Sequence, residues 1–219
     1  MVKIMKKNDI TNFIKILKEA YPDATCSLDF ETPFQIVVAV MLSAQCTDER
    51  VNKTTPELFK RCPTIKNFAD IDIKELEEVI HPCGFYRNKA KNIKLCAKQV
   101  LEKFNGEVPK TMDELLTLAG VGRKSANVIL LEAFGIANGI AVDTHVKRVS
   151  NRIGLSHEKG PEKIEQDLLK IFPKDSLKDI NHLFIWHGRK TCDSRKPLCE
   201  NCSVKNFCEY YKKIVHNIY

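Results

Sequence analysis

The sequence predicts an all-α protein, and three observations support this. Apolar residues recur at helical spacing near both ends of the chain. Helix-length segments alternate with short stretches of Gly, Pro, Asn and Asp along most of its length. No hairpin turn joins two runs of alternating apolar and polar residues, as a β-sheet would need.

The first helix is expected near the start of the chain. Asn8 or Asp9 can cap it, Pro22 follows it, and its apolar side chains fall at positions i, i+3, i+4 and i+7, at Ile10, Phe13, Ile14 and Leu17. A similar amphipathic helix is expected late in the chain, between Pro161 and Pro173, with apolar residues at Ile164, Leu168, Leu169 and Phe172.

The segment Ile36 to Val40 is rich in branched residues, which suit a strand as well as a helix. Because no partner strand stands nearby, we interpret it as a buried helix. Further helices are expected at Lys74–Ile80, Lys89–Phe104, Met112–Leu118 and Arg123–Phe134.

Length and composition indicate a compact globular protein. A chain of 219 residues allows one large core or two modest ones. The longest apolar run, Phe34 to Leu42, is too short to span a bilayer, and Met1 to Asn8 lacks the apolar core of an export signal. We therefore expect a cytoplasmic protein without a membrane partner. A net charge of +7 favours polyanionic partners such as nucleic acid.

Nine cysteines fall into two groups. Five are scattered and suit small core positions, at Cys26, Cys46, Cys62, Cys83 and Cys96. The other four have the spacing Cys192-x6-Cys199-x2-Cys202-x5-Cys208, which supplies soft thiolate ligands for a zinc ion or an iron-sulfur cluster. Arg195 and Lys196 lie between the first two ligands, where an ordered loop could bring them to phosphate.

Gly120 and Gly122 flank Val121 between two expected helices, which predicts a helix-hairpin-helix. Backbone N–H groups at the start of the second helix suit a phosphate, although an ordinary helical corner could also need the glycines. Lys124 follows in the first turn, beside Arg123. Its charged form is disfavoured there, as an amine nucleophile requires, but a solvated phosphate-binding lysine is the plainer interpretation.

Together these residues resemble the endonuclease III family of DNA glycosylases, in the helix-hairpin-helix superfamily. The motifs that carry the resemblance occur in the family's order over nearly the whole chain: Leu42-Ser43-Ala44-Gln45, Leu118 to Lys124 with Ser125-Ala126-Asn127-Val128, Ala141-Val142-Asp143-Thr144-His145, His187-Gly188-Arg189 and the cysteine loop.

The resemblance implies two lobes, a six-helix lobe over residues 25–135 that contains the hairpin, and a cluster lobe of residues 1–24 with 136–219. It also implies that Lys124 is the nucleophile, that Asp143 is the catalytic carboxylate, and that a [4Fe-4S] cluster binds the four cysteines. Without the family, Asp143 would be read as the N-cap of a helix starting at Thr144.

By the same resemblance Gln45 fills the gap left by a flipped nucleotide, and Phe85 wedges into the duplex. The expected partner is double-stranded DNA with oxidised pyrimidines or abasic sites. A monomer is expected, at the nucleoid if the source is bacterial or archaeal. Ala119, Phe85 and Arg87 depart from the family's usual residues, which leaves the wedge and the opposite-base preference open.

Three alternatives compete with a bifunctional enzyme. A related adenine-excising family shares the cluster but lacks a lysine at the position of Lys124. A binding module without chemistry would not need Lys124 and Asp143, and an iron-sulfur redox protein would leave the hairpin unexplained. The sequence therefore favours a glycosylase that also cleaves the DNA strand by β-elimination through a lysine Schiff base.

Overall fold

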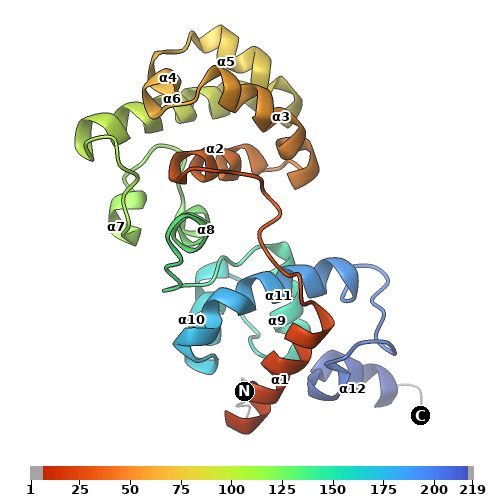
Figure 1. The fold of residues 1–219 in the computed structure, drawn as a ribbon. Helices are drawn as coiled ribbons and strands as arrows, with labels where there is room; N and C mark the ends of the chain where they lie inside the picture. The colour runs from red at the N-terminus through yellow and green to blue at the C-terminus, as the bar shows by residue number, and fades with distance from the viewer. Residues whose placement is uncertain (1–6, 217–219) are drawn as a thin grey trace. The chain divides into compact units, whose positions relative to one another are not determined.

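The structure, a computed structural model, describes residues 7–216 and confirms the all-α fold (Figure 1). Within these residues there is no strand. The α-helices are α1 (Lys7–Ala20), α2 (Pro33–Ser43), α3 (Asp48–Arg61), α4 (Ile65–Asp70), α5 (Ile73–Ile80), α6 (Tyr86–Lys103), α7 (Met112–Leu115), α8 (Arg123–Phe134), α9 (Thr144–Ile153), α10 (Pro161–Ile171), α11 (Leu177–Lys190) and α12 (Glu209–His216). Three short 3-10 helices are η1 (His81–Cys83), η2 (Lys174–Ser176) and η3 (Lys205–Phe207).

The chain divides into two compact units. One is Cys26–Ile136, which contains α2 to α8. Six helices were expected in this unit, and it has one more, because α7 is a separate helix of a single turn. The other combines both ends of the chain, up to Thr25 and from Ala137 onward. The sequence-based division placed these boundaries after residues 24 and 135.

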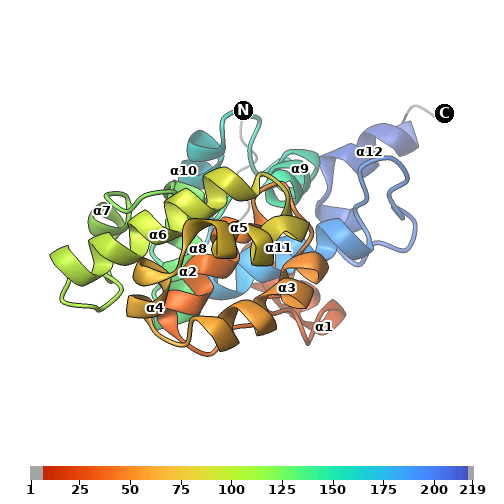
Figure 2. The same ribbon diagram turned by 90° about the horizontal axis from the view of Figure 1, so that it is seen from above.

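Helix α2 forms the centre of the unit Cys26–Ile136. Thr32 caps its start in a reciprocal capping box with Gln35, and Pro33 occupies the first turn. Every residue from 34 to 42 is buried, and α3, α6 and α8 pack around the helix (Figure 2). The interpretation of Ile36 to Val40 as a buried helix is therefore confirmed, and burial on all sides explains why the segment lacks amphipathic spacing.

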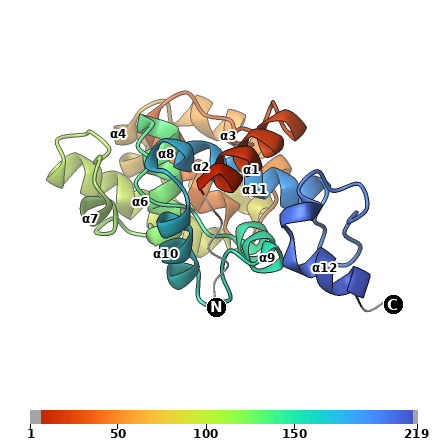
Figure 3. The same cartoon turned by 90° about the horizontal axis from the view of Figure 1, so that it is seen from below.

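The unit built from both chain ends has an aromatic core. The ring of Phe13 on α1 lies 6.2 Å from Phe172, 6.1 Å from Phe184 and 5.6 Å from Phe207, measured between ring centroids. Helix α9 packs against α10, α11 and α12 (Figure 3). The helices expected at Ile10–Leu17 and after Pro161 are both confirmed.

The helix expected at Met112–Leu118 is shorter than predicted. It ends at Leu115, and turns follow up to the hairpin. These turns are needed because the chain must reverse before α8. None of the helices in residues 7–216 is long and apolar enough to cross a bilayer. The prediction that the chain starts without an export signal rests mainly on residues 1–6, which lie outside the described part.

We predict that Phe13→Ala lowers the free energy of unfolding by about 3–5 kcal/mol, because the side chain is fully buried among three rings. The matched control is Phe85→Ala, since Phe85 is 64% exposed and should cost less than about 0.5 kcal/mol. Urea denaturation of both variants measures this. A comparable loss in both would show that Phe85 packs into the fold instead of projecting from it.

Candidate active site

The predicted hairpin joins α7 to α8 and is anchored to α6. Gly120 has a φ of +76°, and an added Cβ would lie 3.0 Å from the Cβ of Asn92 on α6. The side-chain oxygen of Gln99, also on α6, accepts a hydrogen bond from the Ala119 N–H at 2.7 Å. Both the turn and the close approach to α6 therefore require glycine at position 120.

Lys124 lies exposed in the first turn of α8, beside the exposed Arg123. Gly122 occupies the N-cap position, and no side chain caps the helix there. The N-terminal N–H groups and the positive end of the helix dipole therefore point toward whatever binds in front of α8. This arrangement suits an anion such as a DNA phosphate.

Asp143 caps α9, as its sequence position predicted. Its Oδ1 accepts a hydrogen bond from the Val146 N–H at 2.8 Å, and the residue is half-buried. The extended segment before it is held by side-chain acceptors from two other helices. The Ala141 N–H donates to Asn181 at 2.9 Å, and the Ile140 N–H donates to Glu165 at 3.2 Å.

Two arginines connect α9 to the cysteine loop. Arg148 donates to the carbonyl oxygens of Cys192 at 3.0 Å and Gly188 at 2.9 Å. Arg152 donates to the carbonyls of Asp193 at 2.6 Å and Ser194 at 2.9 Å, and lies 3.4 Å from the Cys192 Sγ. The helix capped by Asp143 is therefore fixed to the loop that carries the four predicted ligands.

The four clustered cysteines line one small cavity together with His187. Desolvation, with repulsion from neighbouring thiolates, raises the pKa of Cys202 to about 11. Burial likewise raises the pKa values of Cys199 and Cys208, so without a bound cation these thiols keep their protons at neutral pH. A bound cation has the opposite effect, because its positive charge stabilises the thiolates. Within residues 7–216, no three His, Cys, Asp or Glu side chains are arranged to hold a single metal ion.

His187 is buried against this cavity. Burial lowers its pKa to about 4, its Nδ1 lies 2.8 Å from the Tyr21 hydroxyl, and its Nε2 lies 3.8 Å from the Cys202 Sγ. The five scattered cysteines behave differently: Cys62, Cys83 and Cys96 are buried in the core, and Cys26 and Cys46 pack partly against it.

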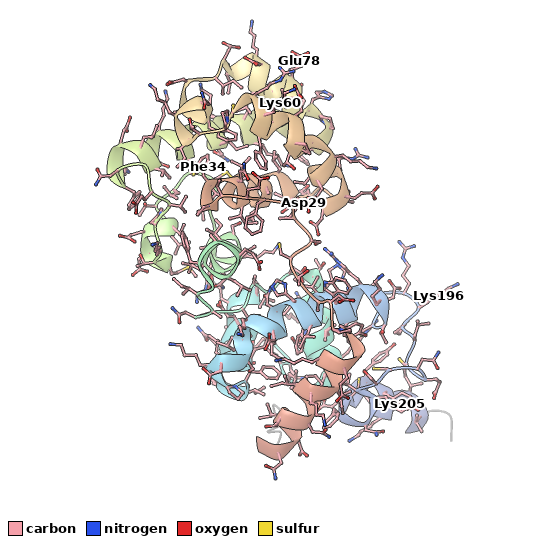
Figure 4. All side chains as sticks on the ribbon, viewed as in Figure 1. Asp29, Phe34, Lys60, Glu78, Lys196 and Lys205 are labelled. Carbon is pink, nitrogen blue, oxygen red and sulfur yellow. The ribbon has the colours of Figure 1, made fainter. Side chains whose placement is uncertain are left out.

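Arg195 and Lys196 are both exposed on the cysteine loop, and Figure 4 labels Lys196 there. Asp193 organises this segment, because its Oδ1 accepts hydrogen bonds from the backbone N–H groups of Arg195 at 2.8 Å and Lys196 at 2.9 Å. The two basic side chains are therefore presented to solvent from an ordered turn.

Gln45 and Phe85, the predicted duplex-inserting residues, share an uncommon backbone conformation. In the described part of the chain, three non-glycine residues have left-handed φ angles: Gln45 at 53°, Phe85 at 48° and Asn105 at 52°. Both predicted residues are exposed, and Phe85 is the most exposed of the large apolar side chains that the structure describes. Such strained positions often mark functional sites.

The structure distributes the predicted residues over both units. Gln45, Phe85 and the segment from Gly120 to Lys124 belong to Cys26–Ile136, while Asp143 and the cysteine loop belong to the other unit. Sequence reasoning did not single out Arg148 or Arg152, nor Lys89, a buried lysine near the start of α6. The two arginines lie one turn apart on α9, but nothing in the sequence indicates which carbonyls they reach.

Comparisons with known proteins agree with this arrangement. Residues 38–174 match the family model described as HhH-GPD superfamily base excision DNA repair protein. The endonuclease III of Synechocystis sp. is 53% identical over 203 residues, 93% of each chain. That of Escherichia coli is 41% identical over 210 residues, 96% of this chain and 99% of the relative.

Two solved structures are similar over nearly the whole chain. A non-covalent endonuclease III–DNA complex has a TM-score of 0.89 and 41% identity, covering 97% of this chain and 99% of that one. A trapped endonuclease III–DNA covalent intermediate, an estranged-adenine complex, has a TM-score of 0.89 and 41% identity, covering 96% and 99%.

We predict that Asp143→Ala lowers the free energy of unfolding by about 1 kcal/mol, because the N-cap acceptor of α9 is lost. Asp143→Asn keeps a side-chain acceptor at the cap and should stay within a few tenths of wild type. Thermal unfolding of the two variants at the same pH makes the comparison. Equal destabilisation by both substitutions would contradict the capping role.

Proposed function

Because the chain belongs to the endonuclease III family, within the HhH-GPD superfamily of base excision DNA repair proteins, we propose that it excises oxidised pyrimidines from double-stranded DNA and cleaves the strand at the abasic site that remains. It is a bifunctional DNA glycosylase and AP lyase. The observation that carries the proposal is Lys124, exposed in the uncapped first turn of α8, in a chain so similar to an endonuclease III trapped covalently on DNA.

We propose that the hairpin and the start of α8 bind a DNA phosphate. An added Cβ at Gly122 would meet nothing within 4 Å, so the fold itself does not require glycine there. Close approach of a phosphate to the backbone N–H groups supplies a reason. Arg195 and Lys196 add phosphate contacts from the cysteine loop, which predicts weaker binding as salt rises.

The target nucleotide must leave the base stack before its sugar can be attacked, at a cost of a few kcal/mol. We propose that Gln45 and Phe85 compensate for this by entering the duplex, Gln45 into the gap and Phe85 between neighbouring bases. Their exposure and fixed left-handed backbone suit this role, since neither side chain has to leave the core to reach DNA.

In the chemical step, the neutral Lys124 amine forms a bond to C1′ while the bond from C1′ to the base breaks, and the base leaves with that electron pair and takes up a proton. The attached nitrogen loses a proton, and the C1′–O4′ bond then breaks with its electron pair on O4′, which takes up a proton; this leaves a protonated Schiff base between Lys124 and C1′. The Schiff base acidifies the 2′ proton, and its loss expels the 3′ phosphate by β-elimination. We propose that Asp143 stabilises the positive charge that develops on the sugar and relays protons.

Asp143 then has two roles, which Asp143→Asn separates. Asparagine preserves the cap of α9 but not the negative charge, so this variant should excise bases more slowly while remaining folded.

We propose that Cys192, Cys199, Cys202 and Cys208 hold a [4Fe-4S] cluster. Four soft thiolates lining one cavity fit such a cluster, and a loop with so little apolar surface needs a cross-link to fold. When bound, the cluster would supply that cross-link and would fix Arg195 and Lys196. A monomer acting on DNA in the cytoplasm remains the expected state.

We predict that Lys124→Ala abolishes cleavage of a duplex containing an abasic site, because no amine remains to form the Schiff base, while affinity for the duplex falls by less than about tenfold. Gel analysis of the end-labelled strand measures cleavage, and fluorescence anisotropy measures binding. Lys66→Ala, which removes an exposed lysine of α4, is the control and should cleave normally. Strand cleavage by Lys124→Ala would refute its assignment as the nucleophile.

We also predict that the purified protein contains iron and acid-labile sulfide in equal amounts, and that Cys202→Ala loses both together with affinity for DNA. Cys96→Ala, which changes a core cysteine of the other unit, should keep both. Elemental analysis distinguishes the ions: stoichiometric zinc without sulfide in wild type would contradict the cluster.

A further inference from the structure

Lys89, near the start of α6, is a buried lysine with two backbone partners. Only 6% of its surface is exposed, and its ammonium group donates to the carbonyl oxygens of Leu42 and Cys83, each at 2.8 Å. Lysine is seldom buried without a specific reason, because removing the charge from water is costly. Desolvation accordingly lowers the pKa of Lys89.

The two carbonyls belong to the segments that carry the proposed duplex-inserting residues. Leu42 lies in the last turn of α2, three residues before Gln45. Cys83 ends η1, two residues before Phe85. Phe85 is also the N-cap of α6, and its carbonyl accepts the Lys89 N–H at 3.1 Å. Lys89 therefore contacts the segment before Gln45 through its side chain, and the segment around Phe85 through both its side chain and its backbone.

The hydrogen bond from Lys89 to Leu42 also stabilises the C-terminal end of α2. The last carbonyls of a helix lack partners within it and carry the negative end of its dipole, so a cation is favourable there. The last turn of α2 has no basic residue of its own. Lys89 supplies the cation from α6, so the end of α2 is bound to the segment before Phe85.

Two further contacts lie beside these turns. Arg50 on α3 donates to the Pro82 carbonyl at 3.3 Å, and the neighbouring Cys46 thiol adds to the effect of burial in raising the pKa of Cys83. Cys46 directly follows Gln45. The Gln45 turn and the Phe85 turn are therefore held as one body, with Lys89 as its buried connection.

We propose that Lys89 is a positioning residue that fixes Gln45 and Phe85 relative to each other, so that both enter the duplex in the same step of nucleotide extrusion. This rests on the proposed function of the chain, and in particular on the roles proposed for those two residues. Lys89 itself touches neither DNA nor the reacting atoms.

A consequence separates positioning from general stability. Extrusion of a paired nucleotide needs both side chains correctly placed, whereas a lesion in single-stranded DNA is already unstacked. Loss of the Lys89 contacts should therefore impair action on paired lesions far more than action on unpaired ones. A defect in folding would lower both alike.

The test compares Lys89→Met with Lys94→Met in the full chain. Methionine keeps much of the length and apolar character of lysine but donates no hydrogen bonds. Lys94 is the matched control: it lies on the same helix and also donates to two carbonyls, that of Ala69 in the last turn of α4 and that of Ile71, the C-cap of α4. Rates of strand cleavage are measured on thymine glycol in a duplex and in single-stranded DNA.

For Lys89→Met we expect kcat/KM on the duplex to fall by about tenfold to a hundredfold, the effect of a small misplacement, with less than about a twofold change on single-stranded DNA. For Lys94→Met we expect kcat/KM on both substrates to equal that of the wild-type protein. In a Phe85→Ala background, Lys89→Met should cause little further loss on the duplex, because both changes then affect the same step.

Equal losses on both substrates would show that Lys89 only stabilises the fold, and unchanged activity on both would show that the contact does not matter; either result overturns the inference. If wild-type protein cleaves neither substrate, the proposed function is wrong, and the inference falls with it.

Discussion

Burial of α2 on all sides is the constraint on which the unit Cys26–Ile136 depends. Because residues 34 to 42 are all removed from water, α3, α6 and α8 must pack around this one helix. That packing fixes the start of α8, and with it Lys124, while the end of α2 leads directly to Gln45. The carbonyl that α2 leaves unpaired at Leu42 is then satisfied by Lys89. The packing of the apolar core thus fixes the positions of Lys124, Gln45 and Lys89, whose polar side chains would not be held in place by water alone.

In the unit built from both chain ends, hydrogen bonds hold the start of α9 and the cysteine loop in place. Asp143 follows an extended segment held by Asn181 and Glu165, and it caps α9. Arg148 and Arg152 tie α9 to the cysteine loop through main-chain carbonyls. The loop of the proposed cluster is therefore connected, through two arginines, to the helix that begins at Asp143, the proposed catalytic carboxylate.

The sequence was most informative where a requirement is local. The glycine at 120, the cap at Asp143 and the apolar spacing from Ile10 to Leu17 each follow from rules that act within a few residues. Helix α3 was not predicted, because it is strongly polar and contains Pro56. Neither the left-handed backbone of Gln45 nor the burial of Lys89 could be predicted, since both depend on tertiary contacts. The spacing of the four clustered cysteines predicted a metal site, whereas the choice of a [4Fe-4S] cluster and the roles of Lys124 and the wedge came from family resemblance.

Mapping the covalent bond between the protein and DNA shows whether Lys124 is the nucleophile. Wild-type protein is incubated with a duplex containing thymine glycol, the adduct is reduced with borohydride, and the digested product is analysed by mass spectrometry. If Lys124 is the nucleophile, the sugar remnant is found on the peptide that contains Lys124, at that residue. An adduct on another lysine, or release of the base with no adduct at all, would contradict this assignment.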